Sequence, residues 1–181
     1  CGVAVHLGVL QPTIKSVLKK FYGLPGRQEY IKTTKGIVFI NDTTATIPEA
    51  SIAAIARFRL KAGKKQLTLI AGGSDKKLVF EEMARTIRES VDELIFLPGS
   101  ATDKLISLLK KKKYSSGLPP MRMATSMDEA VTLAASAAQR GDYVLLSPGA
   151  ASFGLFANEF DRGDQFVNAV RRFLKTRKKD M

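Results

Sequence analysis

The sequence predicts an α/β protein in which a mostly parallel sheet is covered by helices on both faces. Short apolar runs of strand length alternate with longer segments of helical periodicity over most of the 181 residues. Such alternation is typical of βαβ units, whose strands pair in parallel and whose helices cover the sheet. We therefore expect a Rossmann-like three-layer sandwich.

The expected strands are apolar runs too short to be helices. They cover residues 37–40, 67–71, 94–97, 121–124 and 143–146. Each is followed by a segment of helical spacing, and these segments cover residues 50–60, 78–87, 102–109, 127–138 and 166–174. A further helix is expected over residues 12–21. It ends in the breaker run Tyr22-Gly-Leu-Pro-Gly26, which marks a boundary.

Composition narrows the class of protein. Hydrophobic residues make up 45% of the chain, enough for one domain plus a short extension, and no apolar stretch has the length of a membrane helix. The single Cys1 cannot form an internal disulfide, which favours a cytoplasmic protein. The single His6 excludes a His-rich metal site and a Ser-His-Asp triad built elsewhere in the chain. We expect no metal site here.

The net charge of +12 raises the possibility of a nucleic-acid-binding module. Six basic residues and one acidic residue lie in 171–181, and a second basic cluster lies at 110–113. Neither cluster contains the interleaved aromatic residues that stack on bases. The second cluster fits the solvated end of a helix. Nucleic-acid binding is kept as an alternative that a steep salt dependence of binding would reveal.

The first loop whose side chains could bind a ligand follows the strand at 37–40 and runs from Asn41 to Glu49. It is rich in hydroxyl groups. Thr46, placed before Pro48, resembles a helix N-cap, which would explain part of this composition. Capping does not explain Asp42. A carboxylate at the carboxyl end of a strand can bind a ribose hydroxyl.

The second loop, Gly72-Gly-Ser-Asp-Lys-Lys77, follows the strand at 67–71. Its glycines allow close approach of a ligand to the backbone, and Lys76 at an expected helix start would attract an anion. The alternative is an ordinary tight turn with Asp75 as the cap. The chain contains no P-loop and no G-x-G-x-x-G motif.

The third loop, Ser147-Pro-Gly-Ala-Ala-Ser-Phe153, consists mostly of small residues, which leave room for a ligand beside Ser152. Further along, Asp161 and Arg162 precede the last expected helix. These two residues are as consistent with a structural ion pair as with a ligand-binding site.

Four segments taken in order resemble the carboxyl-terminal domain of the Mur ligases. They are Gly23-Leu-Pro-Gly-Arg-Gln-Glu29, Ile40-Asn-Asp-Thr-Thr-Ala-Thr46, Gly72-Gly-Ser-Asp-Lys76, and Leu146-Ser-Pro-Gly-Ala-Ala-Ser-Phe153 with Arg162-Gly163. The first loop lacks the Tyr or His of ligases that add other amino acids, so the resemblance is to the D-glutamate-adding members. It spans residues 23–174. It implies that residues 1–22 are the last helix of a central ATPase domain, and that 23–181 form the D-glutamate-binding domain.

The resemblance implies a cytoplasmic enzyme of peptidoglycan synthesis, and through it of cell shape and division. ATP and Mg²⁺, held mainly by the central domain, would convert the carboxylate of UDP-N-acetylmuramoyl-L-alanine into an acyl phosphate, which the amine of D-glutamate attacks. Residue by residue, Arg27 and Asp42 would bind the nucleotide. The D-glutamate ligands would be Thr46, Lys76, Ser152 and Phe153. The enzyme would be a monomer without nucleic-acid or membrane partners, and this part alone would be inactive, with no catalytic residue of its own.

This sequence departs from the family pattern at four places. Thr44 stands where a lysine is common, and Gly26 stands where a histidine is common. Ala157 replaces a lysine, and Glu159-Phe160 reverses the usual order of aromatic and acidic residues. A folylpolyglutamate synthetase-like ligase of the same family, with another acceptor, is therefore retained as an alternative.

Overall fold

A six-stranded mixed sheet forms the centre of the computed structural model, which describes residues 1–31, 36–111 and 117–179. Its strand order is β1-β2-β6-β3-β4-β5, and all neighbours are parallel except β1 and β2. The strands are β1 (Glu29–Ile31), β2 (Val38–Asn41), β3 (Leu67–Gly72), β4 (Glu93–Leu97), β5 (Met121–Met123) and β6 (Tyr143–Leu146). The predicted, mostly parallel sheet is confirmed, whereas β1 was not predicted.

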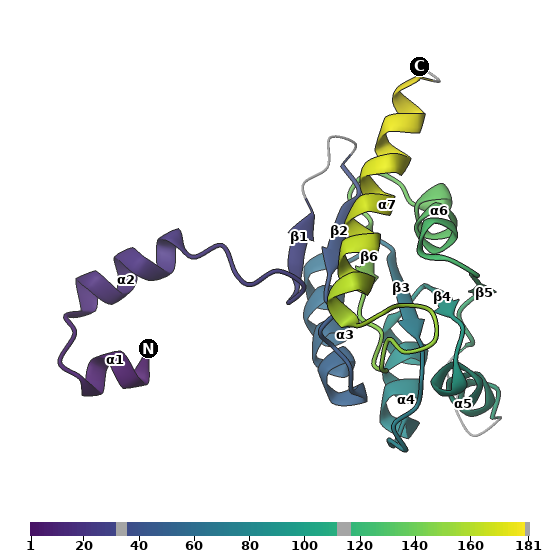
Figure 1. Ribbon diagram of the computed structural model, residues 1–181, viewed down its shortest axis with the longest axis horizontal. Helices are drawn as coiled ribbons and strands as arrows, with labels where there is room; N and C mark the ends of the chain where they lie inside the picture. Colours follow the sequence, from purple (N-terminus) through teal and green to yellow (C-terminus); the bar gives the residue numbers. More distant parts are fainter. Residues whose placement is uncertain (32–35, 112–116, 180–181) are drawn as a thin grey trace.

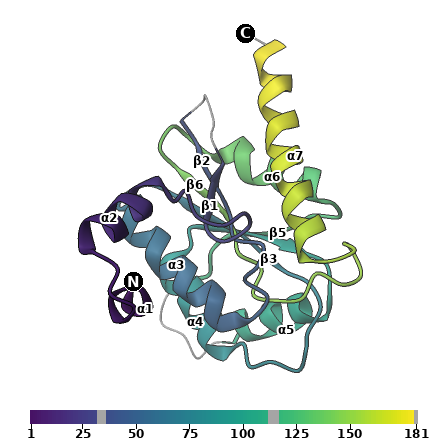
Figure 2. The ribbon, with the colours of Figure 1, turned by 60° about the vertical axis from the view of Figure 1, so that its left-hand side comes forward.

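Helices cover both faces of this sheet (Figures 1 and 2). One face carries α3 (Pro48–Ala62), α4 (Glu81–Ser90) and α5 (Ser100–Leu109), whose apolar side chains join one buried cluster. The other face carries α6 (Met127–Ala137) and α7 (Glu159–Lys179), which belong to a second cluster. The predicted three-layer sandwich is therefore confirmed.

The central strand β3 shows why the apolar runs become strands. All six of its residues are buried, as a strand covered on both faces requires. Leu67 and Leu69 join the cluster beneath α3 to α5, while Ile70 joins the cluster beneath α6 and α7. Side chains that alternate between two cores favour an extended backbone over a helix.

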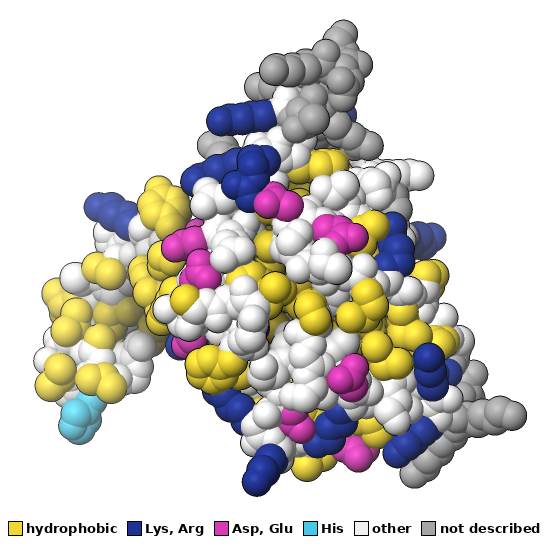
Figure 3. Space-filling view, turned by 45° about the vertical axis from the view of Figure 1, so that its right-hand side comes forward, with side chains coloured by type: hydrophobic (Ala, Val, Ile, Leu, Met, Phe, Trp, Pro, Cys, Tyr) yellow, Lys and Arg dark blue, Asp and Glu magenta, His cyan; other side chains and the backbone are white. Residues whose placement is uncertain are grey.

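The amino-terminal segment stands apart from the sandwich. Figure 1 shows α1 (Gly2–His6) and α2 (Gln11–Lys20) projecting from the body on an extended connection. Neither helix buries a residue, and apolar side chains such as Leu7 and Leu10 are 72% exposed. Figure 3 shows several apolar side chains gathered beside the single histidine, His6. The helix predicted at 12–21 is confirmed as α2, and α1 was not predicted.

Two predicted helix starts were wrong. The helix expected from residue 78 begins at Glu81, because Oδ1 of Asp75 accepts the amide of Leu78 at 2.9 Å and holds a turn before it. The helix expected from residue 166 begins at Glu159. Its first turns are polar and charged, so apolar spacing did not mark them.

None of the helices in the described ranges has both the length and the apolar composition that crossing a bilayer requires. Among the described residues visible on the face in Figure 3, basic and acidic side chains are interspersed.

Candidate active site

The three loops singled out from the sequence lie at one edge of the sheet. They follow β2, β3 and β6, and β6 lies between the other two, so the carboxyl ends of three adjacent parallel strands meet there. We call residues 41–47 the first loop, 72–80 the second loop and 147–158 the third loop. This edge is where open α/β sheets bind ligands.

Backbone contacts tie the third loop to both of the others. Ser74 and Ala151 form an isolated antiparallel bridge, with N–O distances of 2.9 and 3.1 Å. The amide of Gly149 donates to the carbonyl oxygen of Ala45 at 2.9 Å. The third loop therefore joins the first and the second loops into one surface.

The close approach of the second and third loops depends on Gly73. Its φ is +129°, which L side chains rarely adopt, and a Cβ there would lie 2.3 Å from the carbonyl oxygen of Ala151. No side chain fits between these two backbones. The double glycine that predicted close backbone approach therefore serves contact between loops of the protein itself.

Arg162 connects the first and third loops through hydrogen bonds. Its side chain is fully buried, and it donates to Oγ1 and the carbonyl oxygen of Thr43 and to the carbonyl oxygen of Ala150. Burial lowers the pKa of this guanidinium to about 10, which leaves it charged at neutral pH. The ion pair considered for Asp161 and Arg162 is not formed. Asp161 instead accepts the amide of Ala157 and the side-chain amide of Gln165.

Asp42 lies at the base of the first loop with 5% of its surface exposed. Its Oδ1 accepts the amide of Gln28 at 3.1 Å, and its Oδ2 accepts the hydroxyl of Ser147 at 2.8 Å. Burial raises the pKa of this carboxyl to about 6, although both hydrogen bonds and the charges of Arg27 and Arg57 act in the opposite direction. Two hydrogen bonds thus hold the Asp42 carboxyl in place, and its raised pKa lies close to neutral pH.

Arg27 and Asp42, the two predicted nucleotide ligands, line one pocket of about 380 Å³. Gln28, Thr44 and Arg57 also line it, together with three alanines. Sequence reasoning missed Gln28 and Arg57. The signal for Arg57 was available in α3, where residues 50, 53 and 57 fall on one helical face, with alanine at the first two positions.

The four residues expected to bind D-glutamate lie on all three loops. The ammonium of Lys76 lies 6.0 Å from the centre of the Phe153 ring, and Ser74 fixes the second loop to the third by donating to the carbonyl oxygen of Phe153 at 2.6 Å. Ser152 is buried beside this contact. Thr46 is half-buried on the first loop, next to the Ala45 carbonyl that the third loop contacts. The structure thus brings Lys76 and Phe153 together, and places Thr46 on the neighbouring loop.

Two local expectations about these residues were wrong. Lys76 is not at a helix start, because α4 begins five residues later at Glu81. Thr46 does not cap α3, because the N-cap position is Ile47 and no side chain caps it. The hydroxyl of Thr46 has no hydrogen-bond partner within the described ranges of the chain. It is free to contact a ligand.

Two of the departures from the family pattern contact each other. The amide and the hydroxyl of Thr44 both donate to the carbonyl oxygen of Gly26, at 3.1 and 2.9 Å. A Cβ at position 26 would lie 2.8 Å from the Cγ2 atom of Thr43. The small residue at 26 therefore suits the threonines of the first loop.

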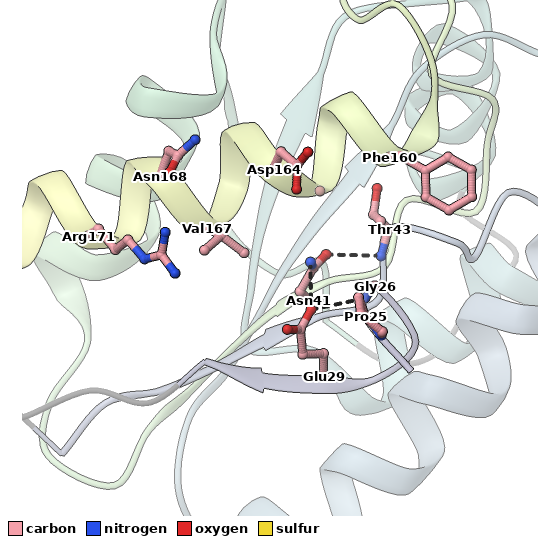
Figure 4. Close-up of a pocket in the computed structure, with 11 residues that line it drawn as sticks. Pro25, Gly26, Glu29, Asn41, Thr43, Phe160, Asp164, Val167, Asn168 and Arg171 are labelled. Atoms are coloured by element: carbon pink, nitrogen blue, oxygen red, sulfur yellow. Dashed lines mark hydrogen bonds between the residues drawn. The ribbon is translucent and has the colours of Figure 1, made fainter. Parts of the chain in front are cut away.

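A second pocket of about 390 Å³ lies between α7 and the start of β1 (Figure 4). Its floor is hydrogen-bonded, since Oε2 of Glu29 accepts the amide of Gly26 and the side-chain amide of Asn41. Figure 4 shows Asp164 and Arg171 extending from α7 toward this floor, with Phe160 at one end. Phe160 is 63% exposed, while the backbone of Glu159 accepts the hydroxyl of Thr43. The reversed aromatic–acid pair therefore places its aromatic ring at the surface.

Among the described residues, no group of three or more His, Cys, Asp or Glu side chains is arranged to hold a metal ion. We assign no magnesium ligand to these residues.

The fold and the joined loops define an α/β domain with a candidate ligand site at the carboxyl edge of a mostly parallel sheet. The profile of the family described as Mur ligase, glutamate ligase domain, matches residues 26–149. The chain belongs to this family, which confirms the resemblance read from the four motifs.

Curated relatives of similar sequence are D-glutamate ligases. The chain is 39% identical over 175 residues to the UDP-N-acetylmuramoylalanine–D-glutamate ligase of Roseiflexus, with 95% of the chain and 35% of the relative covered. The ligase of the same name from Borreliella burgdorferi is 38% identical, with 93% of the chain and 36% of the relative covered. The chain thus spans about a third of the length of these relatives.

Solved structures of this family share the fold. The MurF ligase of Thermotoga maritima, in complex with ADP, superposes with a TM-score of 0.60 at 18% identity, covering 97% of this chain and 36% of that one. FolC of E. coli in complex with ADP gives a TM-score of 0.53 at 19% identity, covering 86% of this chain and 33% of that one. At these identities the likeness establishes the fold alone.

Proposed function

We propose that this chain is the carboxyl-terminal domain of an ATP-dependent ligase that adds D-glutamate to UDP-N-acetylmuramoyl-L-alanine in peptidoglycan synthesis. The observation that carries the proposal is the meeting of the four motifs at one sheet edge, in a chain whose relatives bear the name of that ligase. The family match favours this function over the nucleic-acid-binding module suggested by the net charge.

In this proposal the second and third loops receive the amino acid. Lys76 has no ion-pair partner in the part of the chain that the structure describes, so its ammonium is available to a carboxylate of D-glutamate. The hydroxyls of Ser152 and Thr46 would donate to the carboxylates, and Phe153 would pack against the carbon chain. Held this way, the amine attacks an acyl phosphate formed on the other substrate.

The nucleotide would bind in the pocket that contains Arg27 and Asp42. Both residues follow the breaker run at 22–26, where we place the hinge between residues 1–22 and the ligase domain. In this arrangement the pocket supplies one wall of the ATP site, and a central domain supplies the other wall together with Mg²⁺. Closure at the hinge completes the site. We also propose a cytoplasmic, monomeric enzyme.

The experiment is a ligase assay on two proteins, the complete ligase and this 181-residue chain. With UDP-N-acetylmuramoyl-L-alanine present, the complete ligase should release phosphate from ATP only when D-glutamate is added. The chain alone should be inactive, because the phosphate-binding motif lies outside it. Preference for a folate acceptor would establish the folylpolyglutamate-type alternative instead. D-Glutamate-dependent ATP hydrolysis by the chain alone would contradict the two-domain site.

A further inference from the structure

Helix α3 presents a regular face to the nucleotide pocket. Ala50, Ala53 and Arg57 line the pocket at a spacing that places them on one side of the helix. The two alanines keep this wall flat and leave room for a ligand. Seven residues span about 10 Å along a helix axis, so Arg57 lies two turns beyond Ala50. An elongated ligand lying along α3 would meet a cation at that end.

The Arg57 side chain is held in position although it is exposed. Its Nη1 donates to Oε1 of Gln28 at 2.5 Å, and its guanidinium carbon lies 5.6 Å from the centre of the Phe58 ring. One of five N–H donors is used in the first contact, which leaves the others for a ligand. A restrained side chain loses less conformational entropy when it binds.

No carboxylate of the described residues forms a direct ion pair with Arg57. By contrast, Arg59, two residues further along α3, pairs with Asp92. The charged groups lining the pocket are two arginines and Asp42, and the hydroxyl of Thr44 already donates to Gly26. The pocket therefore carries an excess of positive charge, in the form of two guanidinium groups that match phosphate oxygens.

We propose that Arg57 is a second phosphate-binding residue of the nucleotide site, acting beside Arg27 on the polyphosphate of ATP. The inference rests on the proposed function, in which this pocket takes the nucleotide. Arg57 contacts the phosphates directly, and Gln28 steers its guanidinium. Nothing in this assignment involves the D-glutamate ligands on the second and third loops.

The test uses the complete ligase with single substitutions. Arg57→Ala should raise the KM for ATP and the Kd for ADP by about tenfold or more, as expected for loss of a charge-assisted contact, with KM for D-glutamate unchanged. Arg57→Lys keeps the charge without the planar guanidinium, so its KM for ATP and its Kd for ADP should lie between those of the wild type and those of Arg57→Ala. Lys61→Ala removes an exposed positive charge from the last turn of the same helix and should change nothing.

Two results would overturn the assignment. One is an Arg57→Ala enzyme whose ADP Kd stays within about twofold of the wild type, which is the effect of an ordinary surface charge. The other is an Arg57→Ala enzyme whose KM for D-glutamate rises as much as its Kd for ADP, because the substitution would then act on the whole domain rather than on the phosphate contact. A wild-type enzyme without D-glutamate-dependent turnover would instead remove the proposed function. ADP binding would still decide the role of Arg57 on its own.

Discussion

Arg162 and Thr43 are 119 residues apart in the sequence, yet the guanidinium of Arg162 donates to both the hydroxyl and the carbonyl oxygen of Thr43. A third bond, to the carbonyl oxygen of Ala150, extends the contact to the third loop. This side chain is the buried link that holds the first and third loops at a fixed separation. The positions of Asp42 and Ser152 therefore depend on a residue that touches neither ligand pocket.

The first prediction concerns this link. Arg162→Ala should lower the free energy of unfolding by about 3–5 kcal/mol, because two buried carbonyl groups lose their donor and a cavity is left. Urea denaturation followed by circular dichroism measures the change. Arg172→Ala is the matched control. It removes an arginine whose bonds to Asp128 are exposed, so it should cost less than about 1 kcal/mol. Equal losses in the two variants would show that Arg162 is not a structural link.

The second prediction concerns the contact between the second and third loops. Gly73→Ala should destabilise the protein by about 2–4 kcal/mol, since it forces a side chain into a positive-φ backbone and against the carbonyl of Ala151. Thermal unfolding at fixed pH gives the measurement. Gly117→Ala, at a position with open space around it, should stay within about 0.5 kcal/mol of the wild type. A tolerated Gly73→Ala would mean that the two loops can separate without cost.

The third prediction follows from the pKa of Asp42, which burial raises from 3.8 to about 6. The folded protein then holds this proton more tightly than the unfolded chain. Asp42 therefore contributes stability below pH 3.8, and this contribution is lost as the pH rises through about 6. The full effect is about 3 kcal/mol.

The measurement is the difference in unfolding free energy between the wild type and Asp42→Asn at pH 4 and pH 7. Other carboxyl groups titrate alike in both proteins and cancel, so the wild type should lose stability relative to Asp42→Asn on going to pH 7. A difference that is constant with pH would show that the pKa of Asp42 is the same in the folded and unfolded protein, and a change in the opposite direction would show that folding lowers this pKa; either result contradicts the prediction.

Sequence alone predicted those parts of the fold that depend on local patterns. β3 was predictable because a short, mostly apolar run between polar segments is typical of a strand buried on both faces. β1 was not, because its three residues, Glu-Tyr-Ile, are partly buried or exposed and are too few to show a hydropathy pattern. The first turns of α7 were missed for a related reason, since they are rich in charged residues and show no apolar spacing.

The site was predictable to the extent that chemistry follows strand ends. The rule that ligands bind at the carboxyl ends of parallel strands was enough to select the three loops. It could not select Arg162 or Arg57, because Thr43, which accepts two of the hydrogen bonds of Arg162, lies 119 residues away, and the pocket beside Arg57 is formed only where Arg27 and Gln28 lie near α3. Long-range partners leave no local pattern to read.

The last prediction separates two adjacent lysines of the second loop. Lys76→Ala in the complete ligase should raise the KM for D-glutamate by roughly 10- to 100-fold, the loss of about 1.5–3 kcal/mol expected for a charged hydrogen bond to a carboxylate. Lys77→Ala is the control, since it removes the same charge one residue away without a contact to Phe153. It should leave the KM for D-glutamate within about twofold, as expected for an ordinary surface charge. If Lys76→Ala changed only the kinetics for ATP, Lys76 would belong to the nucleotide site. If both variants changed the KM for D-glutamate equally, the loop would act through its overall charge rather than through one ammonium group.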